Sequence, residues 1–320
     1  MERPIAILYE NESWMAPLFT ALEDASLPYR RLFADDLVVD PARTVDDALL
    51  VNKVSPSSYL RGHARSIEMA RAVLARYEAA GVPVVNGSRP YDLELSKARQ
   101  LGLLQRLGLP YPPGRAANSP SAVVRAAQGL RFPVVVKPNV GGSGALIRVF
   151  GEDAELRASA EGLDFGVDGT VVVQEWLPAA GEAITRLELL EGEPLYAIRI
   201  GIDTSAGFNL CPADICQVPE GALDNCVIDA AKQQRPIERV EVDSRIWRQA
   251  QAIAREGGYD VCGIEFLVDA RTGEHAFYDV NALSNFVTDA SRIVGFDPHA
   301  RFVEYLARRA GYLSAVAAAD

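Results

Sequence analysis

Two neighbouring runs near the C-terminal end carry oxygen-bearing side chains at a spacing suited to a metal ion. Glu265 lies in one apolar run, and Asp279 and Asn281 lie in the next. If both runs are strands, Asp279 and Asn281 share a face, because alternate strand residues point the same way. Pairing through the turn Ala270–Gly273 would bring Glu265 beside them. Oxygen ligands of this kind suit Mg²⁺. A solvent-facing strand with ordinary polar alternation is the competing interpretation.

A lysine followed by glycines indicates phosphate binding. Lys137 ends a β-branched run and precedes Gly141, Gly142, Ser143 and Gly144. Phosphates need a cation and backbone amides that approach closely, and glycines permit that approach. The loop leads into another strand rather than a helix, so it is not a P-loop. A glycine-rich hairpin turn with a surface lysine remains the alternative.

A third segment offers backbone groups that could bind a base. Gln174, Glu175 and Leu177 lie where a strand passes into an extended segment, and Glu182 follows a few residues later. Free backbone N–H and C=O groups there could contact the adenine edge, and a carboxylate could accept from ribose hydroxyls. The alternative is a strand end that leads into a polar loop. In the N-terminal part, a polar loop after a strand offers Asn52, Lys53, Ser57 and Arg61 as substrate contacts, or is simply solvated.

The elements that must position these residues follow from hydrophobic patterning. Strands alternate with helices over the first 90 or so residues, which predicts an open, mostly parallel α/β layer. A helix and a glycine-linked hairpin follow, and then several alternating apolar stretches with a closing amphipathic helix. The predicted division is residues 1–89, residues 90–172 with the glycine-rich loop, and residues 173–320 with the metal site.

Composition narrows the classes of partner. The chain has 320 residues, 49% of them hydrophobic, and a formal net charge of −11. An acidic chain without a Lys/Arg stripe repels nucleic-acid phosphates and anionic membranes, so neither is expected as a partner. The N-terminal apolar run is too short for a signal peptide and nothing approaches a membrane span, so we expect a cytoplasmic protein.

The order and spacing of the three segments resemble the ATP-grasp superfamily. The similarity is to its RimK-like amino-acid ligases, and more loosely to D-alanine–D-alanine ligase. It extends from about Asn86 to the end of the chain. It implies an ATP-grasp fold, α/β and α+β, behind an N-terminal open parallel-sheet domain.

The resemblance also implies roles for individual residues. Lys97 and Lys137 match nucleotide lysines, and Gly141 to Gly144 match the phosphate loop. Gln174, Glu175 and Leu177 match the adenine hinge, Glu182 the ribose contact, and Arg199 an arginine facing the transferred phosphate. Glu265, Asp279 and Asn281 match the metal ligands, with Asp279 where the family usually has Glu. Because the Asp side chain is shorter, the resemblance leaves open whether one or two metal ions bind.

The implied activity is an ATP- and Mg²⁺-dependent ligase that joins a carboxylate to an amine through an acyl phosphate. Its substrates would be an amino acid, a small peptide or a related metabolite. The resemblance also allows the protein to be a homodimer. Two alternatives stand beside this interpretation: an ATP-dependent kinase of a small metabolite on the same fold, and a nucleotide-binding regulator without turnover.

Overall fold

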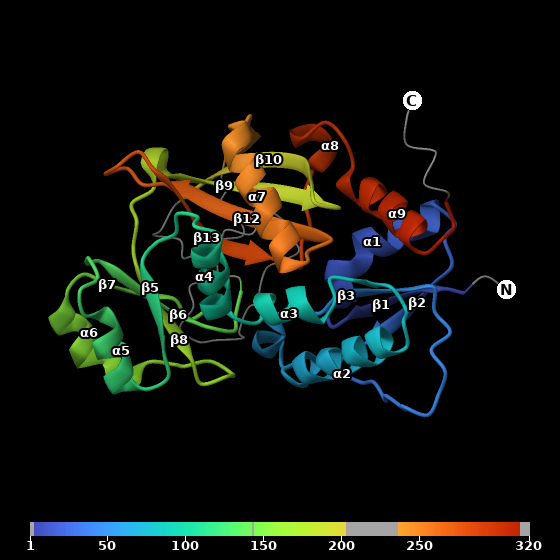
Figure 1. Ribbon diagram of the computed structural model, residues 1–320, viewed down its shortest axis with the longest axis horizontal. Helices are drawn as coiled ribbons and strands as arrows, with labels where there is room; N and C mark the ends of the chain where they lie inside the picture. The colour runs from blue at the N-terminus through green and yellow to red at the C-terminus, as the bar shows by residue number, and fades with distance from the viewer. Residues whose placement is uncertain (1–2, 143, 203–235, 314–320) are drawn as a thin grey trace.

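The described part of the chain folds into three β-sheets with flanking helices (Figure 1). The computed structural model describes residues 3–142, 144–202 and 236–313. Parallel and antiparallel sheets occur together with helices, which confirms the predicted mixed α/β and α+β class. No helix in these ranges is long and apolar enough to cross a membrane.

The N-terminal sheet is parallel, in the order β2-β1-β3-β4. All five residues of β1 are buried, as expected for a strand covered on both faces. Ile5 and Ile7 pack toward α1 and α9, and Ala6 and Leu8 pack toward α2. The elements are β1 (Ile5–Tyr9), α1 (Glu12–Asp24), β2 (Tyr29–Phe33), β3 (Leu49–Lys53), η1 (Ser58–Arg61), α2 (Arg65–Ala79) and β4 (Val84–Val85).

The central sheet is antiparallel, in the order β5-β8-β6-β7, and the helices α5 and α6 cover one face. The predicted hairpin around the glycines is confirmed, since β6 pairs with β7. The predicted boundary between residues 172 and 173 falls inside β8, whose partners both belong to this sheet. The elements are α3 (Ser88–Glu94), α4 (Lys97–Arg106), β5 (Gly114–Ala117), α5 (Pro120–Ala127), β6 (Val134–Pro138), β7 (Arg148–Phe150), α6 (Asp153–Ser159), η2 (Ala160–Gly162) and β8 (Val171–Glu175).

The C-terminal sheet is antiparallel, in the order β11-β10-β9-β12-β13. One face carries Leu187, Ile264 and Val280, which pack with α4 and α7. The other face carries Ile184, Ile198 and Ile200, which pack in the core shared with the N-terminal layer, and the polar residues that line the pocket. The elements are η3 (Ala180–Glu182), β9 (Ala183–Leu190), β10 (Glu193–Gly201), β11 (Ile237–Arg239), α7 (Ser244–Gly257), β12 (Val261–Val268), β13 (His275–Asn281), α8 (Ala290–Ile293) and α9 (Pro298–Arg309).

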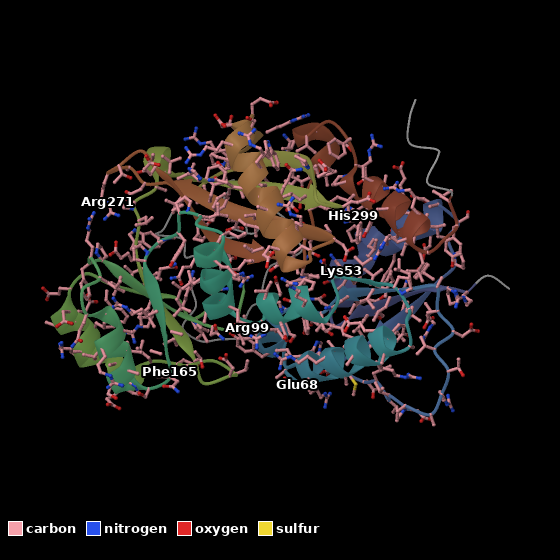
Figure 2. All side chains as sticks on the ribbon, viewed as in Figure 1. Lys53, Glu68, Arg99, Phe165, Arg271 and His299 are labelled. Carbon is pink, nitrogen blue, oxygen red and sulfur yellow. The ribbon has the colours of Figure 1, made fainter. Side chains whose placement is uncertain are left out.

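The last helix returns to the N-terminal layer, where α9 packs beside α1 (Figure 1). Lys53 at the end of β3 and His299 at the start of α9 lie close together at this junction (Figure 2). The Lys53 Nζ donates to the Ser284 carbonyl at 2.6 Å. The segment after β13 is therefore fixed from the N-terminal side.

Candidate active site

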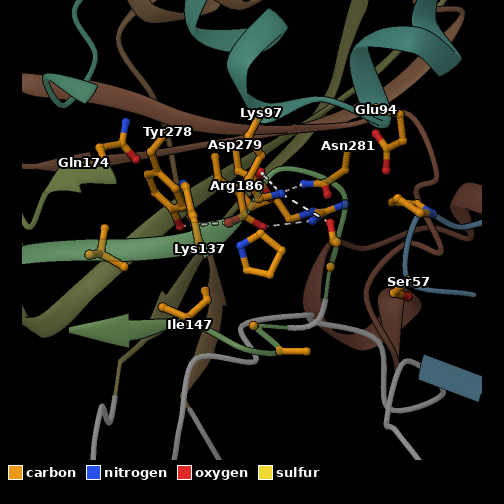
Figure 3. Close-up of a pocket in the computed structure, with 18 of the residues that line it drawn as sticks. Ser57, Glu94, Lys97, Lys137, Ile147, Gln174, Arg186, Tyr278, Asp279 and Asn281 are labelled. Carbon is orange, nitrogen blue, oxygen red and sulfur yellow. Dashed lines mark hydrogen bonds and ion pairs between the residues drawn. The ribbon is translucent and has the colours of Figure 1, made fainter. Parts of the chain in front are cut away.

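One pocket lies where the three sheets meet, and most of the predicted site residues line it (Figure 3). The C-terminal sheet contributes the acidic residues, the central sheet contributes Lys137 and the hinge, and α4 contributes Lys97. The N-terminal layer closes one end with Trp14 and Ser55 to Ser57. Residues more than 200 positions apart thus face a single cavity.

The two predicted lysines enter the pocket from different elements. Lys97 is the first residue of α4, whose N-terminus is capped by the Ser96 hydroxyl. Its Nζ lies 3.3 Å from the Gly141 carbonyl and 3.4 Å from Asp279 Oδ1. Burial lowers the pKa of Lys137 to about 8, and the charge of Lys97 adds to the lowering. Two cations so close, one of them buried, form a site for an anion.

The acidic residues come together as the strand pairing predicts. Glu265 and Asp279 are register partners on β12 and β13, which confirms the predicted pairing of these strands. Asn281 Nδ2 donates to Asp279 Oδ2 at 3.2 Å. Burial raises the pKa of Glu265, although the positive charge of nearby Arg186 acts to lower it. Burial acts in the same direction on Asp279, but Lys97 and Lys137 outweigh it and lower its pKa.

Arg186, on β9, belongs to this site although no role was predicted for it from the sequence. Its Nε donates to Glu188 Oε1 at 2.6 Å, and its Nη1 donates to Glu265 Oε1 at 3.0 Å. Gly263 makes room for it, since a Cβ there would collide with the guanidinium. A basic residue two positions before an acid in an apolar strand was the available signal, but only the register shows which carboxylates it meets.

Two predicted residues lie away from the pocket lining. Arg199 is the register partner of Thr185, so by alternation it points to the face opposite Arg186. It donates to the Gly181 carbonyl at 3.3 Å. Glu182 is exposed at the end of η3, just before β9, with a φ of 48°. Their predicted roles stay predictions, and Ser143 lies outside the described residues.

The hinge leaves one backbone amide open. The amide of Glu175 donates to the Pro113 carbonyl and that of Trp176 to the Pro133 carbonyl, both at 2.9 Å. Within the described ranges, the Leu177 amide has no such partner. Gln174 is held by the Pro112 carbonyl at 2.9 Å. All four of these hinge residues, Gln174 to Leu177, line the pocket, so the Leu177 amide can serve a ligand.

The N-terminal end of the pocket has a different character. The Ser55 and Ser57 hydroxyls lie 2.8 Å apart, and Arg61 Nη1 donates to Ser57 at 3.2 Å. Arg61 is paired with buried Glu10 and lies over the Trp14 ring at 4.2 Å from its centroid. Of the four polar residues predicted in this region, Ser57 lines the pocket, while Asn52, Lys53 and Arg61 do not.

Among the described residues, no group of three or more His, Cys, Asp or Glu side chains could hold a metal ion. A metal at Glu265 and Asp279 therefore needs the Asn281 amide oxygen and oxygens from a ligand. Mg²⁺ is commonly held in this way, by one or two carboxylates together with phosphate and water oxygens.

The chain is similar to known proteins in part of its sequence and in its fold. No family model matches the chain. It is 34% identical over 125 residues to D-alanine–D-alanine ligase of Stutzerimonas stutzeri, covering 39% of this chain and 38% of that protein. It is 30% identical over 155 residues to the carbamoyl phosphate synthase large chain of Pseudomonas syringae pv. tomato, covering 47% of this chain and 14% of that protein. The chain thus spans well under half the length of these curated relatives.

Solved structures match over nearly the whole chain. The ATP-grasp ligase PsnB, in complex with a phosphomimetic variant of its minimal precursor, Mg and ADP, superposes with a TM-score of 0.68 at 20% identity. The match covers 97% of this chain and 99% of that one. A RimK domain protein from Sphaerobacter thermophilus gives a TM-score of 0.67 at 16% identity, covering 94% and 98%.

Proposed function

We propose that this chain, which has the ATP-grasp fold, is an ATP- and Mg²⁺-dependent ligase that joins a carboxylate to an amine. The observation that carries the proposal is one pocket in which Lys97 and Lys137 face Glu265 and Asp279, with the hinge on one side and the N-terminal layer on the other. This lining offers cations, carboxylates and backbone groups to a nucleotide, and the N-terminal end offers further residues to other substrates.

The residues present fit Mg-ATP. Asp279 Oδ1 is buried and accepts no hydrogen bond from the described residues, although Lys97 Nζ lies 3.4 Å away as an ion pair, so it retains lone pairs for a metal. Lys97 and Lys137 would meet the phosphates, as would the backbone of Gly141, Gly142 and Gly144. The amide of Leu177 would meet the base. Glu265, Asp279 and Asn281 would hold Mg²⁺.

Bound ATP would supply the γ-phosphoryl group that activates the carboxylate as an acyl phosphate, with ADP as the leaving group. The amine would then attack the acyl carbon, form the amide and release inorganic phosphate. The protein's part is to position the reactants and neutralise charge. Lys137 supplies a buried cation. We assign the further cation to Arg186 rather than Arg199, because Arg186 shares the pocket face with Glu265. Burial of these groups excludes water, which would hydrolyse an activated acyl group.

The test is ADP release that requires both a carboxylate and an amine, with mass spectrometry of the product. Release that needs only one substrate, with a phosphorylated product, would indicate a kinase, and nucleotide binding without turnover across a broad panel would indicate a regulator.

Asp279→Asn should lower kcat by at least about 100-fold while the melting temperature is kept. Asp289→Asn, at an exposed acid of the same region, should keep full activity. An active Asp279→Asn variant would refute the metal assignment.

A further inference from the structure

Glu94, at the end of α3, is a buried carboxylate that the proposed chemistry does not use. It is 5% exposed and lines the pocket. Its Oε2 accepts the backbone N–H of Ala282 at 2.5 Å. None of the described residues donates a hydrogen bond to Oε1. Burial raises the pKa of Glu94 to about 7, because a charge with so little water around it is costly.

Glu94 lies at the end of the pocket away from the nucleotide hinge. Figure 3 shows Glu94 and Ser57 on one side, Gln174 and Tyr278 on the other, and Lys97, Asp279 and Arg186 between them. The Ala282 bond holds Glu94 beside the segment after β13, whose Leu283 and Phe286 also line the pocket. This end is therefore where a substrate other than the nucleotide would lie.

The other charges that act on Glu94 are those of Asp279, Lys97 and Arg186 at the centre of the pocket. The remaining lining at this end consists of the apolar groups Trp14, Pro56, Leu283 and Phe286, with the neutral polar groups Ser55, Ser57 and Asn285. Arg61 stands behind Trp14 and is already paired with Glu10. In the described part of the pocket, the basic side chains Lys97, Lys137 and Arg186 belong to the centre.

We propose that Glu94 binds the ammonium group of the amine substrate, and that Trp14 and Phe286 hold an uncharged, apolar remainder of that molecule. The inference rests on the proposed ligase function and names the class of its acceptor. An ammonium group has three donors, which Glu94 Oε1 and the Ser55–Ser57 hydroxyls can accept. A divalent cation would need several carboxylate or carbonyl oxygens, and here one carboxylate is present.

The same reasoning excludes other acceptors. An acidic substituent would lie close to Glu94, and the nearest cations, Lys97 and Arg186, already face Asp279 and Glu265. A second ammonium group would be buried without a counter-ion. Both arrangements are costly in a desolvated site. The acceptor is thus a primary amine that carries no carboxylate beside its ammonium group, such as the amide of an apolar amino acid.

Glu94→Gln keeps the shape of the side chain and its bond to Ala282 but removes the charge. We expect the KM for the amine to rise at least about tenfold, with the KM for ATP and for the carboxylate unchanged. Asp92→Asn is the matched control, because Asp92 is an acid on the same helix that lies outside this pocket. Its Oδ2 accepts from Arg99 Nη1 at 3.0 Å. An unchanged amine KM in Glu94→Gln, or an equal rise in all three KM values, would overturn the proposal.

Binding gives a readout that does not require turnover. With Mg²⁺ and a non-hydrolysable ATP analogue present, leucinamide should raise the melting temperature of the wild type but not of Glu94→Gln. Isocaproamide, which lacks the ammonium group, and glutamate should not raise it. No shift with leucinamide, or a larger shift with glutamate, would refute the acceptor assignment. Ligation of acidic acceptors would also refute the acceptor assignment, but it would support the ligase function. Binding of the amine without any ligation would refute the ligase function and leave the acceptor assignment intact.

Discussion

Lys137 is a cation in a position where burial makes a charge energetically unfavourable. It is buried at the end of a strand whose other residues are apolar, with Lys97 nearby. A lysine in such a position is kept only if an anion or neighbouring carboxylates offset the cost of burial. Asp279 and Glu265 supply part of that offset in the ligand-free protein.

Nucleotide affinity should therefore depend on pH. The pKa of Lys137 is lowered to about 8, so in the free protein it is charged below that pH and neutral above it. The affinity for ATP should be flat below pH 8 and fall at higher pH, approaching tenfold per pH unit, because binding requires the proton. Calorimetric titrations across this range would measure it. Lys137→Arg, which stays charged, should show a flat profile. A flat wild-type profile would contradict this role for Lys137.

Arg186 depends on a residue that has no side chain. Gly263 leaves the space that the guanidinium occupies between Glu188 and Glu265. Gly263→Ala should displace Arg186 and lower kcat by about 100-fold, as loss of a preorganised charge does. Gly102→Ala, with open space around the new methyl, is the control. Arg186→Ala should lower kcat by about the same factor, and the double variant should lower it only slightly further. Additive losses in this kinetic cycle would show that the two residues act independently.

Between elements, Asn86 joins the N-terminal layer to the C-terminal sheet. It lies just after β4 with a φ of 51°. Its Nδ2 donates to the carbonyls of Val261 at 2.8 Å and Ala282 at 2.6 Å, and its Oδ1 accepts from the Asp260 amide at 2.9 Å. These bonds fix the start of β12 and the end of β13, which are the strands that carry the acidic residues.

Asn86→Ala should reduce the free energy of unfolding by about 3 kcal/mol. The substitution leaves buried carbonyl and amide groups without partners and places a non-glycine residue other than Asn at positive φ. Urea denaturation would measure the loss. Asn118→Ala, at an exposed position, should change stability by less than about 0.5 kcal/mol. Equal effects of the two substitutions would show that the network contributes little.

At the scale of the whole molecule, the pocket is built by all three sheets. A ligand there contacts residues from each, so its binding free energy stabilises them together. Mg²⁺ with a non-hydrolysable ATP analogue should slow amide hydrogen exchange in β6, β7, β12 and β13. The loop at residues 37–44, which lines a separate surface cleft, should exchange as before. Uniform slowing, or slowing confined to the N-terminal sheet, would place the nucleotide elsewhere.

The sequence determined the local units and their chemistry. Periodicity indicated the parallel N-terminal layer and the glycine-linked hairpin of β6 and β7. It also indicated the alternation that puts Asp279 and Asn281 on one strand face. These features depend on residues close together in the chain. The family resemblance then linked the hinge, the lysines and the acidic residues, which are consecutive motifs in a fixed order.

Only the tertiary structure decided which side chains share a cavity. Strand register fixed Arg186 beside Glu265 and turned Arg199 to the opposite face, and a shift of one residue in either strand would have moved its arginine to the other face. The assignment of β8 to the central sheet, and of Glu94 to the substrate end of the pocket, likewise depended on contacts between distant segments. Such contacts follow from packing of the whole chain, so no local pattern encodes them.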